Sequence, residues 1–170
     1  MFSSRLHKTL VLALALGVVA VSPAQVQPGD QTLHLTTSVG SMRLIDGRGK
    51  VEISFKGTVL ISQLQNGSVI PSGNLKKEYD ARGRQAYFGQ GKLVITGSFR
   101  GIQWFGRDLT ATWTGLGRAR LFGEFDKNLN TGFFWYTHNP KKKSWLTNGI
   151  EALLPERVYQ APRAVPRGGG

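Results

Sequence analysis

Cysteine is absent from all 170 residues, and its absence excludes several classes of protein. A disulfide-stapled secreted module is excluded, as is a bacterial lipoprotein, whose acyl anchor requires a cysteine. Beyond residue 24 the only histidines are His34 and His138, which do not make a zinc pattern. No P-loop, dinucleotide fingerprint or Gly-x-Ser-x-Gly sequence occurs. We therefore expect no metal ion and no cofactor.

Long apolar runs are scarce, and the one that stands out lies at the N-terminus. Thr9–Val21 is unbroken, follows Arg5 and Lys8, and precedes the small-residue sequence Ser22–Ala24. This is the layout of a secretory signal peptide. A membrane-spanning helix is the alternative, but it needs about 20 apolar residues and this run is shorter. We predict that residues 1–24 are a cleaved signal peptide and that the protein is exported to the bacterial periplasm, envelope or exterior.

Acidic residues are few, with 10 against 22 lysines and arginines. Without residues 1–24 the chain keeps 146 residues and a net charge of about +10, enough for one domain with a core. Such a charge attracts anionic polymers, so we expect an anionic polysaccharide or another envelope polymer as partner. Export argues against nucleic acid. The alternative is that the charge serves solubility only.

The chain does have many glycines, which separate short segments of alternating polarity. In Lys50–Ile61 the odd positions are mostly apolar, which predicts a strand with one buried face. Three further segments in Gly83–Phe125 repeat this pattern. The inner faces predicted from the alternation are Val51, Ile53, Phe55, Val59 and Ile61, and then Leu93, Ile95, Phe99, Leu109, Ala111, Trp113, Ala119, Leu121 and Phe125.

These patterns predict an all-β domain over residues 25–154, followed by a disordered Pro/Arg/Gly-rich tail at 155–170. We expect a single antiparallel β-sandwich or compact β-barrel-like domain of about 8–10 short strands. A short β-solenoid is the alternative, because glycine followed by lysine or arginine recurs at strand starts. Those starts, at positions 83, 91, 106 and 117, are irregularly spaced, which favours a loose meander. The polar segment Leu75–Gly83 is expected to be a turn of helix or a loop.

Two groups of acidic residues suggest chemistry, and each has a simpler explanation. Asp126–Gly132 resembles a calcium loop, but its glycine falls one place late, which favours an Asn-rich turn. Asp108, Glu124 and Asp126 would supply the carboxylates of a polysaccharide hydrolase. Nearby arginines explain the same residues as ion pairs. We therefore favour a non-enzymatic protein with a structural, adhesive or binding role, and keep a cell-wall or polysaccharide hydrolase as the alternative.

Aromatic residues interleaved with cations are the strongest sign of a binding surface. Exposed aromatic rings stack on sugars or bases, and neighbouring cations hold anionic groups. The alternative is that the rings fill a small β core. Self-association through exposed sheet edges is a further expectation, and no membrane span is expected once the signal is removed. The candidate binding residues are Arg100, Trp104, Phe105, Arg107, Arg118, Arg120, Tyr136, Lys141, Lys142 and Lys143.

Overall fold

The computed structural model describes residues 31–123 and 132–156. All the secondary-structure elements within these residues are β-strands. The strands are β1 (Thr32–Ser62), β2 (Gln65–Tyr79), β3 (Gln85–Phe122), β4 (Phe133–Tyr136), β5 (Asn139–Ser144) and β6 (Ile150–Leu154). They form one antiparallel sheet in the order β2-β3-β1-β4-β5, with β6 paired to β3. The prediction of an all-β, antiparallel domain is confirmed. The predicted signal peptide and most of the predicted tail lie outside the described residues.

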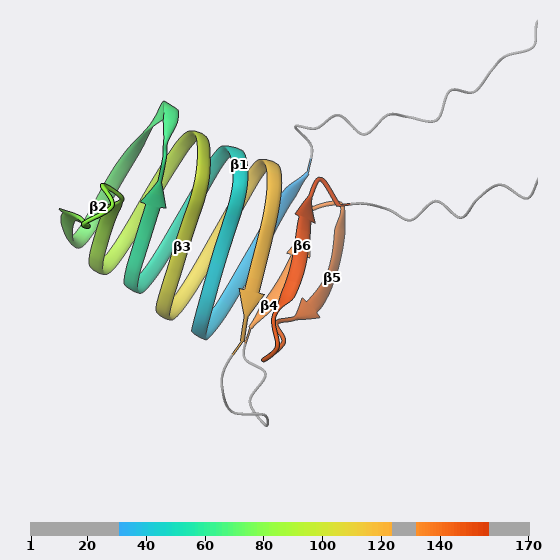
Figure 1. Ribbon diagram of the computed structural model, residues 1–170. Helices are drawn as coiled ribbons and strands as arrows, with labels where there is room; N and C mark the ends of the chain where they lie inside the picture. Colours follow the sequence, from blue (N-terminus) through green and yellow to red (C-terminus); the bar gives the residue numbers. More distant parts are fainter. Residues whose placement is uncertain (1–30, 124–131, 157–170) are drawn as a thin grey trace, which may run out of the picture.

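The long strands β1 and β3 pair with each other twice, because the ribbon that they form is wound into a coil. Lys50 of β1 lies opposite Thr96 on one side and opposite Thr114 on the other, two β3 residues 18 positions apart. A strand has only two edges, so meeting the same partner on both means that the ribbon has made one full turn. Figure 1 shows these turns as a flattened spiral. The segments predicted as separate short strands are thus parts of long continuous ones.

Glycines of successive turns pair directly where the strands bend. The two stacks are Gly89–Gly57–Gly106–Gly40 and Gly97–Gly49–Gly115. Gly49 has a φ of 120°, and a Cβ there would collide with the Thr114 carbonyl oxygen and lie 2.8 Å from the Gly115 Cα. Only glycine permits such an approach. Stacked glycine-punctuated turns are the feature that the solenoid alternative expected, although neighbouring turns here run antiparallel.

The core fills the inside of the coil, between its two facing layers of strands. All the residues of the predicted inner face are at most 3% exposed, except Phe125, which lies outside the described residues. Three tryptophans, Trp104, Trp113 and Trp145, are among the largest fully buried side chains. The alternation in sequence therefore located the core correctly within each turn.

Two of the candidate binding residues belong to this core. Trp104 is fully buried and Tyr136 is 2% exposed, so neither ring is available to stack on a ligand. The sequence places Trp104 among the candidate binding residues because it is out of phase with Phe99 and Leu109. The strand changes its inward phase on either side of it, and Asp108, with a φ of 53°, marks one of these irregularities. A one-residue shift exchanges the two faces of a strand.

The segment Leu75–Gly83 is neither helix nor loop for most of its length. Leu75–Tyr79 completes β2, and a tight turn then leads into β3. The backbone N–H of Gly83 donates to the Asp80 carbonyl at 2.9 Å, and that of Asp80 to the Arg84 carbonyl at 3.1 Å. The coil is therefore one long hairpin, wound up from this turn. The structure contains no helix able to cross a membrane within the residues it describes.

Candidate anion-binding groove

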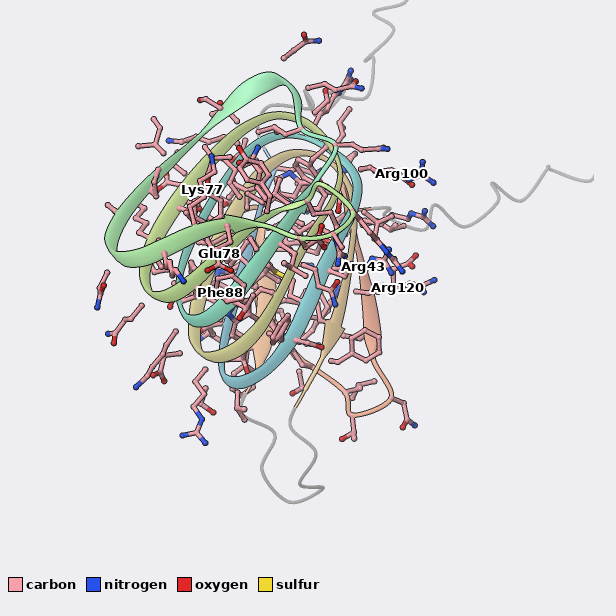
Figure 2. All side chains as sticks on the ribbon, turned by 60° about the vertical axis from the view of Figure 1, so that its left-hand side comes forward. Arg43, Lys77, Glu78, Phe88, Arg100 and Arg120 are labelled. Atoms are coloured by element: carbon pink, nitrogen blue, oxygen red, sulfur yellow. The ribbon has the colours of Figure 1, made fainter. Side chains whose placement is uncertain are left out.

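The largest concentration of arginine lies at one bend of the coil, around two adjoining pockets. The pockets have volumes of about 480 and 490 Å³ and share Gln63 and Arg100 as lining residues. We call the two together the arginine groove. Its polar lining consists of Arg43, Arg48, Arg82, Arg84 and Arg100, with Ser62, Ser98, Gln63, Gln65 and Asp46. Figure 2 shows Arg43 and Arg100 projecting from the same side of the coil, next to Arg120.

Local backbone geometry explains why the groove is open. β1 ends at Ser62 and β2 begins at Gln65, so Gln63 and Leu64 interrupt the ladder at this bend. Gln63 has a φ of 49°, a left-handed conformation that redirects the chain. The break and the neighbouring turn at 80–84 leave a hollow between successive turns of the coil.

The turn at 80–84 fixes two of the arginines. The Asp80 carboxylate accepts the backbone N–H groups of Arg82 and Arg84, each at 2.9 Å, and the Arg84 Nε at 2.6 Å. The hydrogen bond from the Arg84 backbone, assisted by its guanidinium and by Arg82, holds the Asp80 pKa below its usual value. Asp80 is thus occupied in ordering the turn, which presents Arg82 at the rim of the groove.

Positive charge in the groove exceeds the negative charge available to pair with it. Among the described residues, Arg43, Arg48, Arg82 and Arg100 have no carboxylate within ion-pair distance. Arg118 reaches Asp46 and Arg120 reaches Glu151, but each only at 3.4 Å. Arg43 also lies directly opposite Arg120 in the ladder, an arrangement that like charges make unfavourable. An anion bound here would relieve that repulsion.

Elsewhere on the coil, two lysines are paired with a carboxylate of their own chain. Glu52 lies between Lys50 at 2.7 Å and Lys92 at 2.5 Å. Hydrogen bonds from Lys50 and Lys92, together with their charges, lower the Glu52 pKa to about 2. Both lysines already have an anionic partner, so they offer less to an external anion than the arginines of the groove do.

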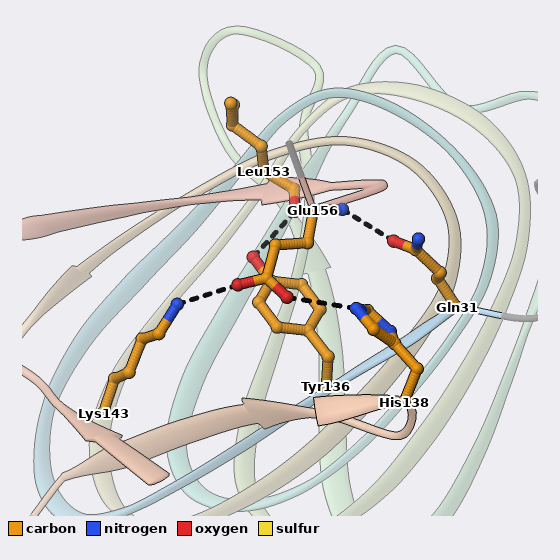
Figure 3. Close-up of polar contacts among 6 residues, drawn as sticks. All are labelled: Gln31, Tyr136, His138, Lys143, Leu153 and Glu156. Atoms are coloured by element: carbon orange, nitrogen blue, oxygen red, sulfur yellow. Dashed lines mark hydrogen bonds and ion pairs between the residues drawn. The ribbon is translucent and has the colours of Figure 1, made fainter. Parts of the chain in front are cut away.

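The three candidate lysines lie on β5, away from the groove. Figure 3 shows Lys143 and His138 holding Glu156, at 2.8 and 3.1 Å. The Glu156 backbone N–H donates to Gln31 at 2.6 Å, and the Tyr136 hydroxyl donates to the Leu153 carbonyl at 2.8 Å. These contacts fasten the end of the described chain onto the coil.

The contacts around Glu156 also shift the acidity of its neighbours. Burial disfavours the charged carboxylate, but the hydrogen bond and charge of Lys143 outweigh burial, so the Glu156 pKa is lowered. Burial, and secondarily the Glu156 charge, raises the pKa of Tyr136 to about 12. Lys142 lies 5.2 Å from the centre of the Trp135 ring. Lys142 and Lys143 therefore contact their own chain, although Lys142, like Lys141, is exposed.

The other candidate residues form two groups that lie apart from each other. Arg100, Arg118 and Arg120 are exposed on the groove side of the coil, and Arg107 and Phe105 line a separate pocket of about 310 Å³ at the other bend. The sequence missed Arg43, Arg48, Arg82 and Arg84. A signal was available for Arg82 and Arg84 alone, because the sequence Asp80-Ala81-Arg82-Gly83-Arg84 is typical of a tight turn with a side-chain acceptor.

The candidate catalytic carboxylates are not brought together by the described part of the chain. Asp108 lines a shallow pocket with Lys56 and Lys92. Glu124 and Asp126 lie outside the described residues, as does nearly all of the predicted Asn-rich turn. None of the four pockets described above is lined by two carboxylates among the described residues. The described residues also include no group of three or more potential metal ligands.

The protein matches no family model, no curated protein and no solved structure. Its function therefore has to be inferred from the geometry of this chain.

Proposed function

We propose that this chain is an exported, non-enzymatic protein that binds anionic polysaccharide or a similar envelope polymer through the arginine groove. The observation that carries the proposal is the set of arginines around two adjoining pockets that no carboxylate of the described residues pairs with. Arginine binds carboxylate and phosphate through two parallel hydrogen bonds, which suits an acidic polymer. Glutamine and serine in the same lining supply hydrogen bonds for sugar hydroxyls.

Two adjoining pockets favour a polymer over a single small anion. Gln63 and Arg100 contribute to both pockets, so a ligand that passes from one to the other stays in contact with them. A chain with an acidic group on successive sugars would meet Arg43 or Arg82 in one pocket and Arg48 in the other. The export predicted for residues 1–24 would place the groove where such polymers occur.

The proposal is tested by retention of the purified protein on immobilised polygalacturonate across a salt series. Exchanging Arg43 and Arg100 for glutamine should weaken binding roughly tenfold for each arginine, because a hydrogen bond to a charged group contributes about 1.5–3 kcal/mol. Lys141→Gln/Lys142→Gln is the matched control, since it removes the same charge from β5. Equal losses from the two double variants would show that net charge alone drives binding, and would contradict a defined groove.

The hydrolase alternative is tested with the same purified protein and the same polymer, polygalacturonate. Asp108→Asn removes the one candidate carboxylate that the structure describes, and its neighbours Lys56 and Lys92 remain in place. Because we propose a binding protein, incubation with polygalacturonate should release no reducing ends from either the original protein or the variant. Release by the original protein that Asp108→Asn abolishes would overturn the proposal.

A further inference from the structure

A row of exposed phenylalanines crosses one face of the coil. Phe88, Phe105 and Phe122 are spaced 17 residues apart, one turn of the coil, and each is followed by glycine. In the ladder Phe88 lies opposite Thr58, Thr58 opposite Phe105, Phe105 opposite Ser41, and Ser41 opposite Phe122. The three rings are 37%, 45% and 39% exposed. We call this line of five side chains the phenylalanine row.

The coil fixes the spacing of the row. Neighbouring strands of a sheet lie about 4.8 Å apart, so successive phenylalanines, two strands apart, repeat at about 10 Å. Thr58 and Ser41, which carry hydroxyl groups, lie on the strands between those of the phenylalanines. A ligand lying across the strands would therefore meet an apolar ring and a hydroxyl group in alternation.

Polar and cationic side chains accompany the row on its groove side. Gln103 and Arg120 come two residues before Phe105 and Phe122, and Arg43 comes two residues after Ser41, so all three share the outer face with the row. Arg43 lies between Gln103 and Arg120 in the ladder and also lines the arginine groove. The row and the groove are thus continuous through Arg43.

We propose that this face binds a linear, extended polysaccharide of acidic sugars, laid across the strands. Ring faces of alternate sugars stack on the phenylalanines, and carboxylates reach Arg43 and Arg120. This inference rests on the proposed function and adds the class of polymer and its direction.

Several features of the face point to this ligand. An extended chain of sugars presents the same ring face at every second unit, which matches rings on every second strand. Phenylalanine has no polar tip, so it contributes through its ring alone. A polyphosphate would satisfy the arginines but has no apolar face for the row. An anionic membrane would need rings that protrude, whereas Thr58 and Ser41 flank these rings within a continuous sheet.

The experiment compares two polyanions on the purified protein, polygalacturonate with sugar rings and inorganic polyphosphate without them. Phe105→Ala should weaken polygalacturonate binding about fivefold or more, the effect of losing one stacked ring, and leave polyphosphate binding unchanged. Phe105→Trp, which keeps an aromatic face, should restore polygalacturonate binding. Arg43→Gln should weaken the binding of both polymers.

Equal effects of Phe105→Ala on the two polyanions, or failure of Phe105→Trp to restore binding, would overturn the inference but leave the proposed function intact. Binding to phosphatidylglycerol vesicles that depends on Phe105 more than polygalacturonate binding does would also overturn it, in favour of a membrane. Absence of binding to either polyanion at low salt would refute the proposed function itself. Phe105 is 45% exposed, and circular dichroism confirms that each variant is folded before its binding is compared.

Discussion

The glycine stacks provide the sharpest prediction about the fold. In Gly49→Ala the new Cβ would lie 2.8 Å from the Gly115 Cα and collide with the Thr114 carbonyl oxygen, so the two turns must separate. A side chain held at a φ near 120° adds a cost on the order of 1–3 kcal/mol. Losing about two ladder hydrogen bonds adds roughly 0.5–1.5 kcal/mol for each. We expect unfolding in urea to show a loss of about 2–6 kcal/mol.

Gly101→Ala is the matched control for that experiment. Gly101 lies on the same coil, but its φ is not in the left-handed range and a Cβ there would come no closer than 3.8 Å to another atom. The substitution should be neutral, or stabilise the fold by about 0.4–1 kcal/mol by restricting the unfolded chain. If the two variants unfold at the same urea concentration, close approach at the glycine stacks does not hold the coil in shape.

Two further predictions concern the core and the end of the coil. Trp104→Ala should lower the free energy of unfolding in urea by about 3–5 kcal/mol, as for other buried aromatic residues. Trp104→Phe should cost much less, because it keeps most of the packing and removes an Nε1–H that has no partner among the described residues. Similar losses in the two variants would contradict the placement of Trp104 in the core. Burial raises the Tyr136 pKa to about 12, so the folded state keeps the proton between pH 10 and 12 while the unfolded state releases it, and stability should fall by about 2–3 kcal/mol over that range. Tyr136→Phe should abolish this alkaline loss in pH-dependent thermal unfolding, and a loss that persists in the variant would rule out Tyr136 as its source.

The fold class could be predicted from the sequence because the burial of a side chain depends mainly on its position within its own stretch of strand. Within one half-turn, alternation decides which side chains point inward, as the burial of Val51, Ile53 and Phe55 confirms. The phase is not carried through the bends, so alternation along the sequence does not predict that Trp104 is buried. Winding of the ribbon is a long-range property, expressed only in pairings such as that of Gly49 with both Gly97 and Gly115.

The period of the coil was nevertheless present in the sequence. Phe88-Gly89, Phe105-Gly106 and Phe122-Gly123 recur every 17 residues. Glycines that precede lysine or arginine do not show this period, because that set includes turn glycines such as Gly83 as well as glycines of the stacks. In each turn, the glycine of a Phe-Gly pair lies at the bend, and the phenylalanine before it points outward.

The groove was harder to foresee than the fold. Its arginines come from β1, from the turn at 80–84 and from β3, and only the winding brings Arg43, Arg82 and Arg100 to one bend. Exposure of Arg100, Arg118 and Arg120 follows from their outward phase. The sequence could not show that Lys143 is engaged by Glu156, because that contact depends on where β5 and β6 end.

Self-association through exposed sheet edges stays a prediction, and it depends on which residues the edge strands carry. β2 is the last strand of the sheet order on one side, and its outer edge carries Pro71, Lys76 and Lys77. Proline and lysine on an edge discourage pairing with another chain.

The central claim is that unpaired arginines in a defined groove bind an acidic polymer, and the salt dependence of polygalacturonate affinity tests it most directly. Each arginine that engages the polymer contributes to the slope of log affinity against log salt, because bound counterions are released. The account predicts that Arg43→Gln/Arg100→Gln flattens this slope and weakens binding, while Lys141→Gln/Lys142→Gln leaves the slope close to that of the original protein. Identical slopes for the two double variants, or no binding by the original protein at low salt, would contradict it.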